Sequence, residues 1–274
     1  MKIAVFYPSN AAWSITNGIV PTLKKMGHTV TDCGTNTPAL DHELIIVSGP
    51  EYLWRTLREA YPDWDAQKCA KVGWLHETVQ REDYATNPIA VNGVLPVDIL
   101  KKLTPKLFTG AIQDQNYGME FLPCGVDADV FYPRKKNKDN DSIYTGALYP
   151  KRLQYLDKYR IRERAGYRQY DTVEEYAEAL AKATVVLNLP TLSSMSTARV
   201  FEVLASGTAL ISPALEHQDG LFLDGYHLLY YKADPKAMYR ISKYKHEALA
   251  HNGLHEVLEK HTMVHRLTKI LSSV

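Results

Sequence analysis

Short apolar runs alternate with helix-like segments along the first half of the chain. The runs typical of buried strands are Lys2–Tyr7, His28–Cys33, Glu43–Ser48, Lys71–His76, Leu107–Ala111 and Glu120–Leu122. Helical patterns fill the intervals at Gly18–Met26, Glu51–Ala60 and Pro96–Leu103. Strands that alternate with helices in this way predict βαβ units and a mostly parallel sheet.

The same alternation restarts after Pro133–Asn140, a polar and charged stretch without periodicity that indicates a linker or exposed loop. The strands expected beyond it are Ser142–Ala147, Thr184–Leu189, Thr208–Ser212 and His227–Tyr231. The helices expected are Tyr149–Tyr159, Thr172–Ala183 and Ala198–Ser206, then three helical stretches up to Val274. Thr172 and Glu175 have the spacing of a capping box.

The length of 274 residues fits two domains better than one compact core. We therefore expect an α/β protein with one Rossmann-like domain at residues 1–133 and a second at residues 134–274. Ligands bind beyond the carboxyl ends of the strands in open α/β sheets. The cleft between the two domains is the expected site.

Several classes of protein are disfavoured by the sequence. No run of 18 apolar residues is present, so we expect no membrane span, and the first strand lacks the features of a secretory signal. The three cysteines, Cys33, Cys69 and Cys124, are far apart and show no C-x-x-C spacing. Zinc and disulfide frameworks are therefore not expected. A cytoplasmic location is expected instead.

The charge is unevenly divided along the chain. Residues 1–133 carry 11 Lys and Arg against 15 Asp and Glu, whereas residues 134–274 carry 21 against 16. A basic second half suits a phosphate-bearing ligand, and a solvated surface explains the same excess equally well.

Four blocks of sequence carry recognisable motifs. They are Phe121-Leu122-Pro123-Cys124-Gly125-Val126-Asp127 with Phe131-Tyr132-Pro133; Ser142–Gly146 with Tyr149-Pro150-Lys151-Arg152; Leu187-Asn188 with the run from Arg199 to Ile211; and Gly225-Tyr226-His227 up to Tyr231. In this order they resemble group 1 glycosyltransferases of the GT-B type, most closely the CgeB/YkvP-like subgroup with its phage-type members. The resemblance covers most of residues 121–240, and Cys124 stands where the family usually has Asn.

This resemblance implies a GT-B fold, with two Rossmann-like domains facing across an interdomain cleft. Residues 1–133 would form the acceptor side, and residues 134–274 would bind a nucleotide sugar, expected to be UDP-linked. The donor is then a substrate, and no separate cofactor is required. A non-catalytic nucleotide-sugar-binding module is the alternative of another class, because fold does not fix function.

Arg199 and Glu202 lie three residues apart and share one face of the predicted helix. The carboxylate of Glu202 can accept hydrogen bonds from ribose hydroxyls, and Arg199 can form a forked pair with a diphosphate. Ser196 and Thr197 would lie at the N-terminus of this helix, where an anion is favoured. The alternative for Arg199 and Glu202 is a surface ion pair of little consequence.

The resemblance implies further donor contacts. Gly146 would let a phosphate approach the backbone, and Arg152 would neutralise the same diphosphate or face water on its helix. Asn188 either orients the donor-binding loop or caps a turn. Asn17 and Gly18 end the loop after the first strand, which resembles the loop that faces the donor diphosphate.

Candidate catalytic residues come from the first half. His76 and Glu77 follow the carboxyl end of a predicted strand, where a general base belongs, although a strand-end cap is an equal alternative. Glu77 is the better base for an inverting reaction, and inversion and retention both stay open. Asp83 and Asp114 are weaker candidates of the same kind.

No metal is expected. Asp63-Trp64-Asp65 matches a D-x-D motif, but it lies in a loop of the first half and is typical of a solvated turn. Basic side chains and a helix N-terminus can stabilise a leaving nucleoside diphosphate without a metal ion.

The acceptor is open between a glycan, a protein, a small molecule and DNA. Six tyrosines interleave with seven Lys and Arg between residues 144 and 170, a composition that suits nucleic acid. Transfer to hydroxymethylated DNA bases is therefore an alternative function. The sequence pI of about 7.7 lies below the range of a committed DNA binder.

Overall fold

The computed structural model describes 15 stretches of the chain. They are residues 1–7, 18–34, 41–49, 64, 68–76, 78–80, 95–134, 138–146, 148, 150–158, 166–168, 170–189, 195–217, 219–231 and 242–274. The chain divides into two compact units, Met1–Cys124 with Met263–Val274, and Gly125–Thr262. The division falls at residue 124 where the sequence led us to expect it at residue 133, and the last helix belongs to the first unit.

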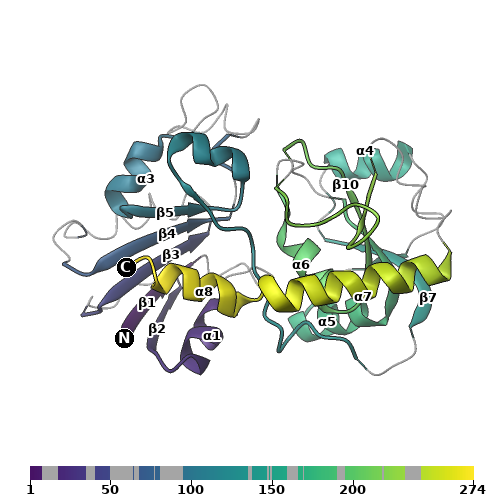
Figure 1. Cartoon of the computed structure of the whole chain (residues 1–274), viewed down its shortest axis with the longest axis horizontal. Coiled ribbons are helices and arrows are strands. Elements are labelled where there is room, and N and C mark those ends of the chain that lie inside the picture. Colours follow the sequence, from purple (N-terminus) through teal and green to yellow (C-terminus); the bar gives the residue numbers. More distant parts are fainter. Residues whose placement is uncertain are drawn as a thin grey trace. The chain divides into compact units, whose positions relative to one another are not determined.

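The first unit contains a parallel sheet with the strand order β2-β1-β3-β4-β5-β6 (Figure 1). Its strands are β1 (Lys2–Phe6), β2 (Thr29–Gly34), β3 (Leu44–Gly49), β4 (Ala70–Leu75), β5 (Lys106–Thr109) and β6 (Glu120–Phe121). All six residues of β3 are buried, as expected for a central strand of a parallel sheet covered on both faces. The predicted strands of this half are thereby confirmed.

Helical elements of the first unit are α1 (Ile19–Lys25), α3 (Val97–Leu103), the 3₁₀ helix η4 (Ile112–Tyr117) and α8 (Met263–Leu271). The predicted helices at residues 18–26 and 96–103 are confirmed, and η4 was not predicted. The helix predicted at residues 51–60 lies outside the described residues.

Helix α8 packs back on the first unit, beside α1 (Figure 1). Its buried residues include Leu267 and Ile270, which recur at helical spacing. Arg266 is buried with them, and its Nε donates hydrogen bonds to the carbonyl oxygens of Pro123 at 2.8 Å and Cys124 at 3.1 Å. Burial lowers the pKa of Arg266 to about 10, so the guanidinium stays charged at neutral pH. This contact explains why the end of the chain belongs to the first unit.

The second unit contains a parallel sheet with the order β11-β10-β9-β7-β8. Its strands are β7 (Asp139–Thr145), β8 (Gly166–Arg168), β9 (Ala183–Leu187), β10 (Ala209–Pro213) and β11 (Leu229–Tyr231). Its helices are α4 (Pro150–Lys158), α5 (Val173–Lys182), α6 (Ala198–Ala205) and α7 (Lys243–Lys260). All predicted strands and the three named helices are confirmed, and the short β8 was not predicted. Of the three helical stretches expected near the end, the structure describes α7 and α8.

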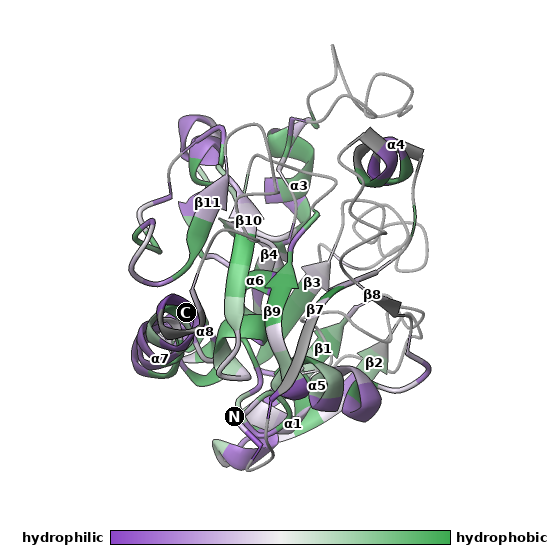
Figure 2. Cartoon of the chain, turned by 90° about the vertical axis from the view of Figure 1, so that its right-hand side faces the viewer, coloured by the Kyte–Doolittle hydropathy of each residue, from purple (hydrophilic) through white to green (hydrophobic). Residues whose placement is uncertain are grey.

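Apolar residues of β9 and β10 form the centre of the second unit (Figure 2). The capping box at α5 is confirmed, since Thr172 Oγ1 accepts a hydrogen bond from the Glu175 backbone N–H at 3.2 Å. Within the described residues, no helix has both the length and the apolar character that a membrane span requires.

The strand order of the second sheet changes direction between β7 and β9. The chain passes from β7 to β8 on one side and from β9 to β10 on the other. Gly146 follows β7, and Asn188 follows β9. Such a switch point at the carboxyl ends of the strands is where open α/β sheets bind ligands. The corresponding loop of the first sheet, residues 8–17 after β1, lies outside the described residues.

We predict that Arg266→Ala lowers the free energy of unfolding by on the order of 2–3 kcal/mol, because two buried carbonyl oxygens lose a charged donor. Val264→Ala is the matched control, since Val264 lies on the exposed face of the same helix. Urea unfolding of both variants measures the difference. Equal stability of the two variants would contradict the anchoring role of Arg266.

Candidate functional site

Two guanidinium groups converge on Gly146 at the carboxyl end of β7. The backbone of Gly146 has φ +101°, a conformation that favours glycine. A methyl group there would collide with Nη2 of Arg199 and would lie 3.0 Å from Nη1 of Arg152. The absence of a side chain therefore brings two cations next to exposed backbone, an arrangement suited to a phosphate.

Arg199, in the first turn of α6, is held by Asn188 from the end of β9. Its Nη1 donates to Asn188 Oδ1 at 3.4 Å, and Asn188 Nδ2 donates to Ser212 Oγ at 3.0 Å. The Nε atom of Arg199 is buried and has no hydrogen-bond partner among the described residues. A buried donor without a partner is unfavourable, so this guanidinium is poised to bind an anion. Asn188 thus orients the side chain of Arg199, a contact that the sequence did not predict.

Arg152, on α4, is 7% exposed, and its Nε donates to the carbonyl oxygen of Leu189 at 2.7 Å. This burial excludes the solvated helix face that the sequence left open for Arg152. The same contact joins α4 to the segment after β9. Arg152 and Arg199 thus approach Gly146 from different helices of one unit.

Glu202 is buried in the second turn of α6, where only 8% of the residue is exposed. Its Oε2 accepts a hydrogen bond from the Tyr176 hydroxyl at 2.9 Å. Burial raises the pKa of Glu202 to about 7, and the contact with Tyr176 and the charge of Arg199 oppose the rise. Arg199 and Glu202 are therefore not the surface ion pair that was the alternative from sequence.

Ser196 and Thr197 lie at the start of α6, as predicted. Thr197 is the N-cap residue, and its side chain makes no capping hydrogen bond. The hydroxyl of Ser196 donates to Asp219 Oδ2 at 2.6 Å, while Asp219 Oδ1 accepts from the Leu221 backbone N–H at 3.1 Å. Asp219, which the sequence did not single out, thereby fixes the segment in front of α6.

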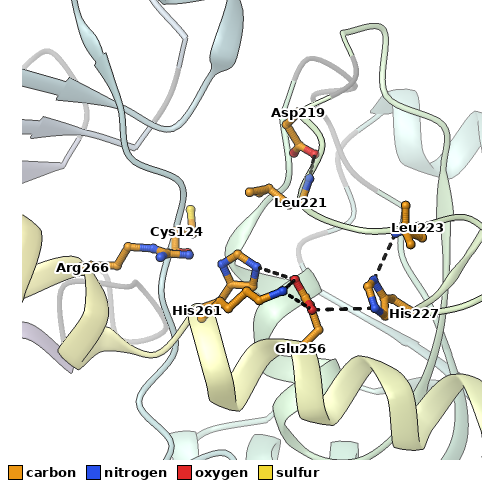
Figure 3. Close-up of polar contacts among 9 residues, drawn as sticks. Cys124, Asp219, Leu221, Leu223, His227, Glu256, His261 and Arg266 are labelled. Carbon is orange, nitrogen blue, oxygen red and sulfur yellow. Dashed lines mark hydrogen bonds and ion pairs between the residues drawn. The ribbon is translucent and has the colours of Figure 1, made fainter.

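The loop after Asp219 is held against α7 by a buried polar cluster (Figure 3). His227 Nδ1 accepts from the Leu223 backbone N–H at 3.1 Å, and its Nε2 lies 3.8 Å from Glu256 Oε2. His261 Nε2 lies 3.7 Å from the other carboxylate oxygen of Glu256. Burial lowers the pKa of His227, which favours the neutral ring that this contact with Leu223 requires. The cluster gives the loop a fixed position.

In the first unit, His76 lies directly after β4, at the strand end predicted for it. Its Nε2 is 2.9 Å from the hydroxyl of the buried Ser48, and its ring packs edge-on against Trp74. Burial lowers the pKa of His76 to about 3, so the ring is neutral at physiological pH. The neighbouring Glu77 lies outside the described residues.

Asp114 is completely buried and does not fit the general-base role considered from sequence. Its carboxylate accepts hydrogen bonds from Thr78 Oγ1 at 2.8 Å, the Val79 backbone N–H at 3.0 Å and Thr109 Oγ1 at 2.8 Å. Burial raises the pKa of Asp114, and the three donors oppose that rise. Asp114 instead joins the segment after β4 to the end of β5.

Other predicted residues fall partly outside the described structure. Asn17, Asp63, Asp65 and Asp83 are not described, and neither are residues 147, 149, 159–165 and 169 of the basic and aromatic stretch at residues 144–170. Gly18 is described as the buried N-cap residue of α1. Across the described residues, no three His, Cys, Asp or Glu side chains are grouped to hold a metal ion.

Comparisons with known proteins place these observations in a family. Residues 133–272 match the model of the glycosyl transferase-like family. No curated protein matches the sequence.

Solved structures match over the whole chain. HepE from Anabaena, in complex with UDP-glucose, has a TM-score of 0.72 at 12% identity, with 100% of both chains covered. Sucrose-phosphate synthase from Thermosynechococcus elongatus has a TM-score of 0.68 at 12% identity, with 100% of this chain and 98% of that chain covered. AviGT4, a glycosyltransferase involved in avilamycin A biosynthesis, has a TM-score of 0.66 at 12% identity, with 99% and 96% covered.

These likenesses confirm the predicted α/β fold with two Rossmann-like sheets, which is the GT-B fold. The family match lies over the half of the sequence that contains Gly146, Arg152, Asn188, Arg199 and Glu202. The chain therefore belongs to the glycosyl transferase-like family.

Proposed function

We propose that this protein transfers a sugar from a UDP-linked donor to an acceptor hydroxyl, and that its second unit binds the donor. The observation that carries the proposal is the convergence of Arg152 and Arg199 on Gly146, beside the buried carboxylate of Glu202. All four residues lie at the switch point of one parallel sheet or on the helices that follow it. HepE, one of the solved structures similar to this chain, holds UDP-glucose.

The two arginines are assigned to the diphosphate. Charge develops on the leaving diphosphate as the bond to the sugar breaks, and two guanidinium groups stabilise it without a metal ion. The Nε of Arg199, which has no hydrogen-bond partner in the described part of the chain, supplies one donor, and Asn188 keeps that side chain in place. Ser196 and Thr197 add the N-terminus of α6, where backbone N–H groups favour an anion.

Glu202 is assigned to the ribose of the donor. A carboxylate accepts hydrogen bonds from a pair of vicinal hydroxyls, as acidic residues do in dinucleotide-binding folds. Because Glu202 is buried, water competes weakly for these bonds once the nucleotide is bound.

The first unit is assigned to the acceptor. Glu77 acts as the general base that takes the proton of the acceptor hydroxyl, and His76 is a neutral hydrogen-bonding group beside it. The buried Asp114 holds Thr78 and Val79, so it supports the backbone that follows Glu77. Asn17 and Gly18 keep the diphosphate-contacting role that the sequence resemblance implies. Within the family, we place the chain in the CgeB/YkvP-like subgroup with its phage-type members.

Replacement of the proposed ribose ligand tests the donor site. We expect Glu202→Ala to weaken UDP binding by at least about tenfold, because ribose hydroxyls lose a charged acceptor. Isothermal titration calorimetry with UDP measures the change. Glu174→Ala is the control, since Glu174 is exposed on α5, and a cooperative melt shows that each variant folds. Unchanged UDP affinity in Glu202→Ala would remove Glu202 from the site.

Replacement of the proposed base separates catalysis from donor binding. We expect Glu77→Gln to lower the rate of UDP release from the donor by about 10²-fold or more, because the amide cannot take a proton. UDP affinity should stay at the wild-type value. Asp98→Asn, at an exposed position of the same unit, is the control for loss of a carboxylate. Normal turnover of Glu77→Gln would assign the base to another residue.

A further inference from the structure

Tyr176 has the position of a core residue, yet its hydroxyl contacts the candidate site. It belongs to the buried stripe of α5, next to Ala177 and one turn before Leu180. The ring packs edge-on against Phe131, with ring centroids 5.8 Å apart, and at a tilt against Tyr170, with ring centroids 5.9 Å apart. These contacts fix the ring and direct its hydroxyl toward the neighbouring helix α6.

The Tyr176 hydroxyl lies between the two opposite charges of α6. It donates to Glu202 Oε2 at 2.9 Å and interacts with the Arg199 guanidinium. Burial and the adjacent Glu202 carboxylate raise the pKa of Tyr176 far above its usual range. The phenol therefore stays protonated and remains a hydrogen-bond donor at neutral pH.

One carboxylate oxygen of Glu202 is thus engaged inside the protein. Within the described residues, the other oxygen, Oε1, accepts no hydrogen bond. A carboxylate fixed through one oxygen presents the other in a defined direction, as a preorganised acceptor should.

We propose that Tyr176 is a positioning residue for ribose recognition: its hydroxyl holds Glu202 by Oε2, so that Oε1 faces the ribose hydroxyls of the donor. This inference rests on the proposed donor site and adds a residue that contacts no substrate. Tyr176 acts through Glu202, and it sets both the direction and the ionisation of that carboxylate.

Ionisation links this role to pH. Glu202 must be a carboxylate to accept two hydroxyl hydrogen bonds, and burial raises its pKa to about 7. Tyr176 on α5 and Arg199 on α6 are the titratable groups of the described structure that face it, and both lower its pKa. Ribose recognition is therefore present above about pH 7 and is lost as the pH falls through that value. Removal of the Tyr176 hydroxyl shifts this loss to higher pH.

The test compares UDP with 2′,3′-dideoxy-UDP, which lacks both ribose hydroxyls. Calorimetric affinities are measured from pH 6 to pH 9 for the wild type, Tyr176→Phe and Tyr226→Phe. Tyr226 is exposed in the same unit and serves as the control for loss of a phenol hydroxyl. The wild type and the control should prefer UDP, and the preference should fall below about pH 7.

For Tyr176→Phe we expect the preference for UDP at pH 7 to fall by about tenfold. The pH below which the preference is lost should be higher than in the wild type. Affinity for 2′,3′-dideoxy-UDP should change much less than affinity for UDP, because Asn188 still holds Arg199 when the Tyr176 hydroxyl is removed. An equal loss of affinity for both ligands, with no change in the pH at which the preference for UDP is lost, would show a merely structural role and overturn the inference.

The same experiment separates this inference from the proposed function. A wild-type protein that binds UDP and the dideoxy analogue equally at every pH contradicts the assignment of Glu202 to the ribose, and the inference with it. A wild-type protein that prefers UDP while Tyr176→Phe keeps the full preference contradicts the role of Tyr176 alone. The wild-type pH profile tests the ionisation step without any substitution.

Discussion

The parallel pairing of β7 with β9 is the contact on which the candidate site depends. Ile143 lies opposite Val186 in this pair, so the two strands end at the same edge of the sheet. From these ends the chain continues to β8 on one side of the pair and to β10 on the other. Neither connection therefore has to cross over the carboxyl ends of β7 and β9. Gly146 and Asn188 are the residues at these ends, and α6 follows with Arg199. The position of the proposed anion site is thus a consequence of strand order, to which the side chains add charge.

Burial of charge at this position has a stability cost that a ligand can offset. Arg199 retains a buried donor without a partner among the described residues, and Glu202 has a pKa raised to about 7 by desolvation. Each group partly stabilises the other, since opposite charges in a low-dielectric interior attract strongly. In the proposed function an anionic nucleotide supplies this partner, which would link binding to folding. Tyr176 holds Glu202 and Asn188 holds Arg199, so contacts within the protein position both charges.

Local patterns in the sequence were sufficient for most elements, because apolar runs and caps depend on near neighbours. Strand β3, predicted at Glu43–Ser48 from its apolar run, and the capping box at Thr172 were predicted on that basis. Strand β8 spans three residues, too few for a periodic pattern. Tyr176 occupies an ordinary core position of α5, and the contact of Asp219 with Ser196 joins residues far apart in sequence. No local signal marks such tertiary contacts, nor the return of α8 to the first unit.

The central claim is that the second unit recognises a nucleotide sugar, and the melting temperature of the wild-type protein tests it most directly. A panel of UDP-, GDP- and other nucleotide sugars would be titrated while thermal unfolding is followed. A ligand that binds only the folded state raises stability with its saturation, by about 2.7 kcal/mol at one hundred times its Kd. We predict that a UDP-linked sugar raises the melting temperature and that sugars linked to other bases raise it less. A cooperative melt that none of these donors shifts would contradict the claim.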